Sequence, residues 1–312
     1  MSEDGNNNWE RGVLEKLATA ALAEQRKARR WGIFFKLLTF GYLFLLLFIA
    51  IDWIGHKDGA LPGKHTAMVS VDGEIAADSR ASAENVIAGL QDAFDDKNTQ
   101  GVVVRINSPG GSPVQAGYIN DEIRRLRAKY PDIPVYAVVE DVCASGGYYV
   151  AAAADKIFVD KASLVGSIGV LMDGFGFTGT IDKLGVERRL LTAGENKAFL
   201  DPFSPLPAEQ REYAQKMLNE IHQQFIKVVK DGRGKRLKDN PEIFSGLIWT
   251  GARSVELGLA DGFGSVESVA RDVVQAADVV DFTPRENIAD RLAKRFGAGA
   301  ASSLQGRFPS IR

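Results

Sequence analysis

The chain has a single cysteine, Cys143, and only three histidines, His56, His65 and His222. One cysteine excludes a disulfide within the chain, so stability must come from the hydrophobic core or from assembly. The histidines give little support to a Ser-His-Asp triad. The first two flank an apolar N-terminal run, and His222 stands beside Ile221 in a helical pattern. A nucleophilic serine in this chain therefore needs another base, and lysine is the other known partner of serine.

Other classes of function are disfavoured by what is scarce. The net charge is −2, and no basic stripe or aromatic platform is present, which argues against nucleic acid as a partner. The glycine-rich turns are not followed by Gly-Lys-Ser/Thr, which disfavours a phosphate-binding loop. We predict no metal and no cofactor. No internal repeat is present in the 312 residues, which can hold one large domain or two small ones.

One long apolar run, residues 37–54, carries no charge except Asp52. It is near the short limit for a membrane-spanning helix. Aromatic residues at its ends resemble interfacial anchors: Trp31, Phe34, Phe35, Tyr42 and Trp53. Basic residues are concentrated before it: Arg26, Lys27, Arg29, Arg30 and Lys36. The positive-inside rule predicts a cytoplasmic N-terminus, with everything after His56 outside the cytoplasm. A cleaved signal peptide and a buried core helix are the alternatives.

We therefore expect five segments. They are a cytoplasmic N-terminal segment (1–36), a transmembrane anchor (37–54), a linker (55–65), a globular domain (66–282), and a C-terminal helix and tail (283–312). Within the domain, short β-branched runs alternate with helical patterns, which predicts a βαβ architecture with a parallel sheet. The expected strands are 68–71, 102–106, 135–139, 157–159 and 168–172, and the expected helices include 83–94 and 207–230.

A serine stands at a predicted strand–turn–helix junction, in the segment Val142-Cys143-Ala144-Ser145-Gly146-Gly147-Tyr148-Tyr149. Such a turn exposes the hydroxyl, and the helix N-terminus adds backbone N–H groups and partial positive charge, as a nucleophile requires. The alternative is that Ser145 caps the helix and that the glycines only permit close packing. We expect Cys143 to be a buried small hydrophobe rather than a nucleophile.

A second turn, Asn107-Ser108-Pro109-Gly110-Gly111-Ser112-Pro113, follows the strand expected at 102–106. Two consecutive glycines let backbone N–H groups point into one small space, which would stabilise the oxyanion of a tetrahedral intermediate. An ordinary Pro-Gly turn is the alternative. Both turns lie at the C-terminal ends of strands, where open α/β sheets bind ligands.

Taken together, several segments resemble the signal peptide peptidases of the S49 serine peptidase family. The similar blocks keep the family's order and spacing from about residue 66 to residue 270. They are 107–111, 140–148, Gly166-Ser167-Ile168-Gly169-Val170, Ala193-Gly194-Glu195-Asn196-Lys197, 250–252, 258–261 and 264–265.

The resemblance implies a fold like those of Clp protease and the crotonases, a βαβ superhelix with a parallel sheet. It implies Ser145 as the nucleophile, Lys197 as the general base and Ser167 as the group that positions the lysine. It also implies an oxyanion hole at Gly110 and Gly111, assisted by Gly146. A lysine with an ordinary pKa of about 10.4 keeps its proton at neutral pH, so such a base must lie in a dry, apolar site. A solvated loop lysine is the alternative for Lys197.

For the whole protein, the resemblance implies a membrane-anchored serine endopeptidase that cleaves apolar peptides such as remnant signal peptides. It implies a place in a bacterial inner membrane, with one span and the catalytic domain in the periplasm. It also implies a ring-like homo-oligomer, although each chain carries both dyad residues and the dyad need not be shared. Two alternatives remain open. One is a catalytically silent membrane scaffold of the same fold, and the other is a crotonase-like acyl-CoA enzyme with paired catalytic carboxylates.

Overall fold

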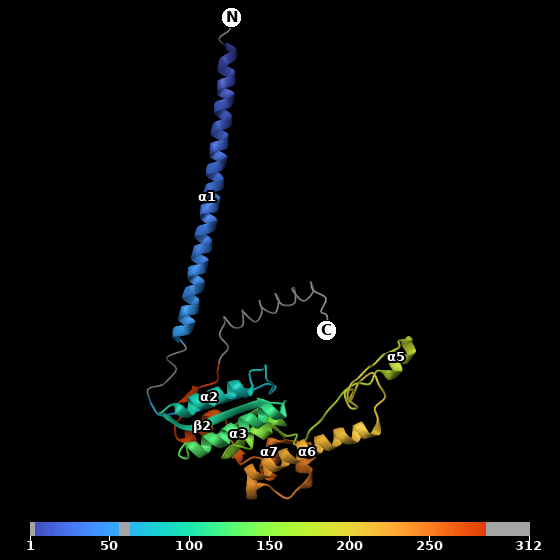
Figure 1. Ribbon diagram of the computed structural model, residues 1–312. Coiled ribbons are helices and arrows are strands. Elements are labelled where there is room, and N and C mark those ends of the chain that lie inside the picture. Colours follow the sequence, from blue (N-terminus) through green and yellow to red (C-terminus); the bar gives the residue numbers. More distant parts are fainter. Residues whose placement is uncertain (1–3, 56–62, 285–312) are drawn as a thin grey trace. The chain divides into compact units, whose positions relative to one another are not determined.

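The structure is a computed structural model that describes residues 4–55 and 63–284 (Figure 1). The chain divides into two units, residues 1–59 with 286–312, and residues 60–285. The linker predicted at 55–65 lies largely outside the described residues. The C-terminal helix and tail predicted at 283–312 lie outside them except for Thr283 and Pro284.

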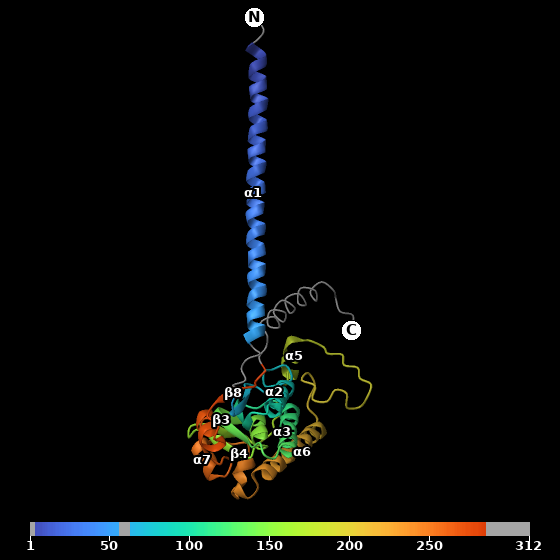
Figure 2. The ribbon, with the colours of Figure 1, turned by 90° about the vertical axis from the view of Figure 1, so that its left-hand side faces the viewer.

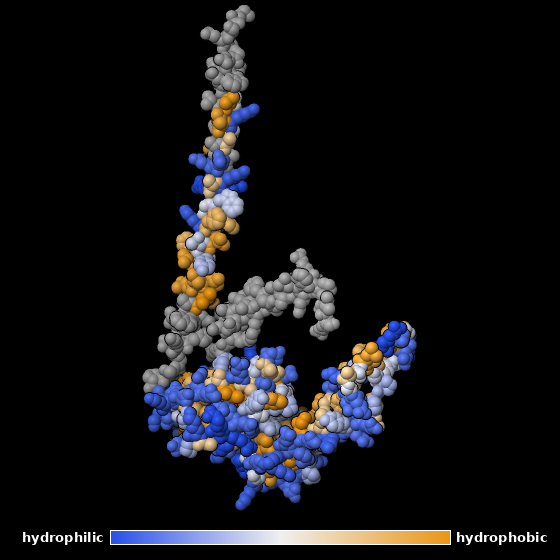
Figure 3. Space-filling model, viewed as in Figure 1, coloured by the Kyte–Doolittle hydropathy of each residue, from blue (hydrophilic) through white to orange (hydrophobic). Residues whose placement is uncertain are grey.

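Helix α1 (Asp4–Gly55) contains the apolar run. Its stretch Glu24–Ile49 has a mean hydropathy of 2.2 and is long and apolar enough to cross a membrane. None of that stretch is buried against protein, which contradicts the alternative of a buried core helix. On the surface of α1, hydrophilic side chains precede an apolar band (Figure 3). This arrangement suggests a membrane anchor, whereas its orientation and compartment stay predictions.

The domain is built on one eight-stranded sheet with the order β6-β5-β3-β2-β1-β8, in which β4 pairs with β3 and β7 (Figures 1 and 2). Every pairing is parallel except that of β5 with β6. The strands are β1 (His65–Asp72), β2 (Thr99–Ser108), β3 (Val135–Ala144), β4 (Lys156–Val159), β5 (Leu164–Gly166), β6 (Ile248–Thr250), β7 (Gly262–Phe263) and β8 (Val279–Asp281). The predicted α/β class with a mostly parallel sheet is confirmed.

Alternate residues of the central strands face two different cores, because successive side chains of a strand point to opposite faces. Val102 and Val104 of β2 belong to the larger core, whereas Val103 belongs to a smaller one with Val266 and Val269. The larger core also includes residues of α2 (Ala83–Asp95), α3 (Pro113–Lys129), α4 (Gly146–Ala151) and α6 (Ala208–Arg233). The smaller core is formed with α8 (Val266–Ser268) and the π-helix η3 (Val269–Val274). The remaining helices are α5 (Thr178–Leu184), η1 (Gly234–Arg236), η2 (Pro241–Phe244) and α7 (Gly251–Glu256).

Serine caps explain where two of these helices begin. The Ser82 side chain accepts a hydrogen bond from the N–H of Asn85 at the start of α2, and Ser112 does the same for Gln115 at the start of α3. Such caps satisfy backbone donors that have no partner within the helix. The first residue of α3 is Pro113, which suits this position because a proline has no N–H to leave unpaired.

The strand predicted at 168–172 is wrong. Strand β5 ends at Gly166, and Ser167 adopts a φ of 51°, which no extended strand can contain. From this residue the chain leaves the sheet. Residues 171–206, which we call the arm, project from the domain and carry α5 (Figure 1).

The arm is held by a small cluster of its own. The Phe177 N–H donates to the carbonyl of Pro202 at 2.7 Å, and the rings of Phe177 and Phe203 lie 5.6 Å apart. Arg188 pairs with Asp201 and lies over the Phe203 ring. Many of the remaining apolar side chains are exposed: Leu171, Met172, Phe175, Leu184, Val186, Leu190, Leu191 and Leu206. An apolar surface of this extent is typical of an interaction site.

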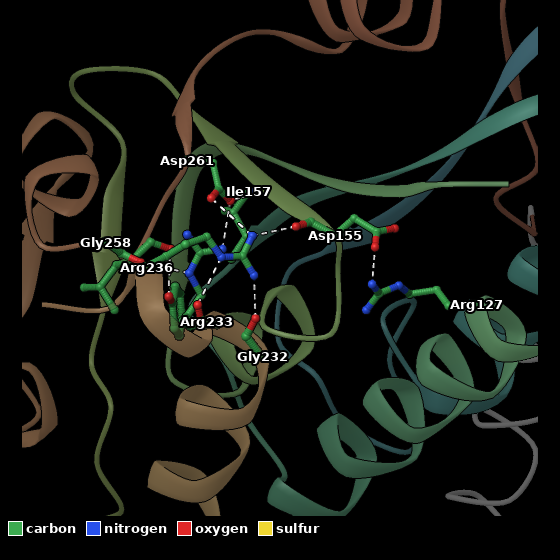
Figure 4. A network of polar contacts seen from close by, with 10 residues as sticks. Arg127, Asp155, Ile157, Gly232, Arg233, Arg236, Gly258 and Asp261 are labelled. Carbon is green, nitrogen blue, oxygen red and sulfur yellow. Dashed lines mark hydrogen bonds and ion pairs between the residues drawn. The ribbon is translucent and has the colours of Figure 1, made fainter. Parts of the chain in front are cut away.

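Helix α6 is fixed to the sheet at its C-terminal end by a network of charged groups (Figure 4). Arg233 is 1% exposed and donates to the Gly258 carbonyl and to Asp261, each at 2.8 Å. Arg236 donates to the other oxygen of Asp261 and to the Asp155 carbonyl. Burial opposes ionisation of Asp261, but hydrogen bonds from Arg233 and from the Ile157 N–H outweigh it, so the pKa of this carboxyl is lowered.

We expect Asp261→Ala to lower the free energy of unfolding by about 3–5 kcal/mol, because it leaves the Arg233 guanidinium buried without its counter-ion. Urea unfolding of the full chain in mild detergent measures this change. Asp272→Ala is the control, since Asp272 pairs with Arg271 in solvent and its loss leaves the unfolding midpoint nearly unchanged. Equal effects of the two substitutions would contradict the structural role of the network.

Candidate active site

Ser145 occupies a strained turn between β3 and α4. Its φ of 52° and ψ of −121° suit glycine rather than a side-chain-bearing residue, and such a conformation costs about 1–3 kcal/mol. The Ser145 N–H donates to the Gly166 carbonyl at 2.8 Å. Its side chain makes no capping hydrogen bond to α4, so the interpretation of Ser145 as a helix cap is not supported. Among the described residues, the Ser145 hydroxyl has no hydrogen-bond partner, and it lies at the N-terminus of α4.

Strand pairing brings a second serine beside the first. Ala144 of β3 pairs with Gly166 of β5 in parallel register, and the next residue of each strand is a serine with positive φ. Ser145 and Ser167 therefore leave the sheet side by side, joined by the hydrogen bond from the Ser145 N–H to Gly166. The structure thus brings together two of the three residues that the sequence predicts for the catalytic group.

The two glycines after β2 pack against this turn. A Cβ placed on Gly110 would lie 2.7 Å from the Ser145 Cβ and from the Gly146 nitrogen. A Cβ on Gly111 would lie 2.3 Å from the Ile75 carbonyl oxygen. Backbone bonds between 110–112 and Ile75 hold this loop, with Ile75 N–H donating to Gly110 and Ser112 N–H donating to Ile75. Only glycine fits either position, which an ordinary Pro-Gly turn would not require.

The backbone donors of the predicted oxyanion hole differ in availability. The Gly110 N–H already donates to the Ser108 hydroxyl at 3.1 Å. Gly111 and Gly146 approach each other closely, since a Cβ on Gly146 would lie 3.3 Å from the Gly111 nitrogen. In the described part of the chain, neither of these two N–H groups has a hydrogen-bond partner. The geometry therefore favours Gly111 and Gly146 as donors, with Gly110 as the close-packing residue between them.

Lys197, the predicted base, stands in a different segment from the two serines. It belongs to the arm and its side chain is exposed. Among the described residues, no hydrogen bond joins Lys197 to Ser145 or Ser167. The residues that follow it rest on the N-terminal part of α6, where Phe199 packs edge-to-face on Tyr213 and the Leu200 N–H donates to Gln210. The loop that carries Lys197 is thus attached to the N-terminal part of α6.

The middle of the same helix contacts the serine region. The ring of His222 makes a 3.1 Å hydrogen bond through Nε2 to the carbonyl of Ile168, the residue after Ser167. His222 and Tyr213 are nine residues apart, which is about 14 Å along a helix. The loop that carries Lys197 and the serine region therefore contact α6 at two separate points along the helix.

Cys143 is fully buried, and burial raises the pKa of its thiol. It is therefore the small hydrophobe that the sequence predicts and not a nucleophile. Tyr148, three residues after Ser145, is also fully buried, and its hydroxyl donates to the Leu259 carbonyl at 2.7 Å. No group of three or more His, Cys, Asp or Glu side chains within the described residues could hold a metal ion.

Sequence reasoning missed three supporting residues. The Ser108 hydroxyl accepts a hydrogen bond from the Gly110 N–H. Asn107 accepts from the Val142 N–H at the register shift between β2 and β3, just before the serine turn. The third is His222, taken as the flank of a packed helix. The polar pair Asn107-Ser108 at a strand end was the one available signal, because parallel strands end at a common edge.

Comparison with known proteins identifies the family. Residues 127–280 match the model of Peptidase family S49. A protein of Enterococcus faecium named "Putative signal peptide peptidase SppA" is 30% identical over 235 residues, which are 73% of this chain and 67% of that protein. The chain belongs to peptidase family S49.

Other relatives match shorter shares. "Putative protease MJ0651" of Methanocaldococcus jannaschii is 36% identical over 190 residues, 61% of this chain and 60% of that protein. A Brucella melitensis protein named "Na(+)/H(+) antiporter NhaA" is 50% identical over 182 residues, 58% of this chain. The chain covers 25% of that protein's length, so the antiporter name describes a much longer chain. The roles of Ser145, Lys197, Ser167 and the three glycines stay predictions.

We expect Gly110→Ala to reduce acylation of Ser145 by about 10²-fold, the loss that a misplacement of order 1 Å can cause. The new methyl group would displace the serine turn. Labelling by a fluorophosphonate, timed over minutes, measures the rate. Gly117→Ala in α3 is the control, because nothing lies within 4 Å of its added Cβ and labelling is expected to be unchanged. Wild-type labelling of Gly110→Ala would contradict the close packing of this turn.

Proposed function

We propose that this protein is a membrane-anchored serine endopeptidase that uses a Ser–Lys dyad. The observation that carries the proposal is the strained Ser145 turn beside the unpartnered N–H groups of Gly111 and Gly146. A hydroxyl at a helix N-terminus, next to two convergent backbone donors, is the arrangement that acyl transfer requires. Membership of peptidase family S49 supports the same chemistry.

In the proposed reaction, Ser145 Oγ attacks the scissile carbonyl carbon while Lys197 Nζ takes the hydroxyl proton. The Gly111 and Gly146 N–H groups then donate to the oxyanion, and one such donor is typically worth about 2.7–4 kcal/mol. As the C–N bond breaks, Lys197 returns the proton to the leaving amine. Water then attacks the ester, Lys197 takes its proton, and that proton passes to Ser145 Oγ as the acid product leaves. In this proposal Ser167 orients the lysine.

We further propose that Lys197 reaches the serine of a neighbouring copy in a ring-like homo-oligomer. Two observations support this arrangement over a dyad within one chain. Lys197 is exposed, whereas a neutral lysine needs a dry site. The arm that carries it also exposes apolar side chains that a second copy would cover. A single contact between two copies would then bury the apolar side chains of the arm and exclude water from the Lys197 amine.

The membrane anchor and the nature of the substrate belong to the same proposal. An apolar helix suited to span a bilayer would hold the catalytic domain near the membrane surface, on the outer face if the positive-inside rule applies. Peptides that stay with a membrane are apolar, and remnant signal peptides fit that description. The E. faecium relative carries a name of this kind.

The direct test is Ser145→Ala. We expect this variant to fold as the wild type does and to lose cleavage of a synthetic apolar peptide and labelling by a fluorophosphonate. A silent scaffold would show no labelling of either protein. Peptide cleavage that survives Ser145→Ala would defeat the assignment of the nucleophile.

A mixing experiment tests where the lysine comes from. Ser145→Ala and Lys197→Ala are each expected to be inactive. When subunits of the two are dissociated and reassembled together, a shared dyad restores part of the peptidase activity, because the serine of one variant meets the lysine of the other. The control is the mixture of Ser145→Ala with a Ser145→Ala, Lys197→Ala double variant, which stays inactive. No recovery in the first mixture would place both residues in one chain.

A further inference from the structure

His222 makes a hydrogen bond to the segment that follows Ser167. Its Nε2 lies 3.1 Å from the carbonyl oxygen of Ile168, and the ring is half-buried on the inner side of α6. A carbonyl oxygen can only accept, so Nε2 carries the hydrogen. This contact gives a structural role to His222, which takes no part in the proposed reaction.

The segment that His222 contacts is held in an unusual conformation. Ser167 has a φ of 51°, its N–H donates to the Leu247 carbonyl at 2.8 Å, and its carbonyl accepts from the Gly169 N–H at 2.9 Å. Ile168 is fully buried. Strained backbone of this kind persists only where its surroundings over-determine it. Within the described residues, the His222 contact is the one hydrogen bond from a side chain to this segment.

The part of α6 that carries His222 is held firmly against the domain. The Arg233–Asp261–Arg236 network fixes its C-terminal end to the sheet. Phe225 and Val229 pack into the main core between this network and His222. His222 is therefore held from a packed part of the helix, while the Lys197 loop rests on the part beyond it. The Ser167 segment and the loop that carries Lys197 thus both contact α6.

We propose that His222 is a positioning residue for the peptidase site. Its Nε2–H holds the Ile168 carbonyl and thereby keeps Ser167 next to Ser145, where Ser167 can orient the incoming lysine. His222 acts through the backbone of Ile168 and does not touch the substrate. The inference deepens the proposed function and rests on it.

The test compares His222→Gln with His222→Asn in the full chain in detergent. Both carry a neutral amide, but only the glutamine amide reaches where Nε2 lies. We expect His222→Gln to keep fluorophosphonate labelling of Ser145 within about threefold of wild type. His222→Asn is expected to lose about tenfold or more, since small misplacements are costly. In cleavage of the synthetic apolar peptide, His222→Asn is expected to lower kcat and to leave KM little changed, because the Ser167 segment orients the base rather than the peptide.

Gln223→Asn is the matched control for the effect of asparagine on α6, because Gln223 is the exposed neighbour. It is expected to label like the wild type, and urea unfolding of all four proteins monitors stability. Equal labelling rates for His222→Gln and His222→Asn, whether fast or slow, would overturn the inference. So would an equal loss in Gln223→Asn. A wild type that is not labelled at Ser145 defeats the proposed function itself, and this inference with it.

Discussion

The candidate site depends on one backbone hydrogen bond, from the Ser145 N–H to the Gly166 carbonyl. This bond joins the ends of β3 and β5. The residue that follows each strand, Ser145 or Ser167, has a positive φ. The bond sets the two serines side by side, and Ser145 packs closely against Gly110. Ser145 and Ser167 lie side by side and both have strained backbones. The surrounding sheet must therefore be stiff, and the buried parallel strands supply that stiffness.

Much of the fold follows from local patterns in the sequence. The buried runs at 102–106 and 135–139 alternate with amphipathic segments, and serine caps at Ser82 and Ser112 mark helix starts. The close approach of the two turns was also predictable, because parallel strands end at one edge of the sheet. Positive φ at Ser167 was not, since no local pattern announces a left-handed serine. For this reason the predicted strand at 168–172 is wrong.

Other features depend on contacts between segments far apart in the chain. His222 looked like an ordinary helix residue because its partner, Ile168, lies in the loop after β5. The helical pattern at 207–230 correctly indicated α6, but it could not show that one end is fixed by Arg233 while the other carries the Lys197 loop. The exposure of Lys197 was hidden for the same reason, since its neighbours Ala198 and Phe199 suggest burial.

Under the proposed shared dyad, the arm has a consequence for when hydrolysis begins. In a single copy the Lys197 side chain is exposed, and within the described residues no hydrogen bond joins it to Ser145. If a neighbour must supply that amine, newly inserted copies are harmless while they are sparse. Peptidase activity would then rise more steeply than the number of copies as they assemble. Under the proposed shared dyad, this dependence on assembly would limit cleavage by isolated copies.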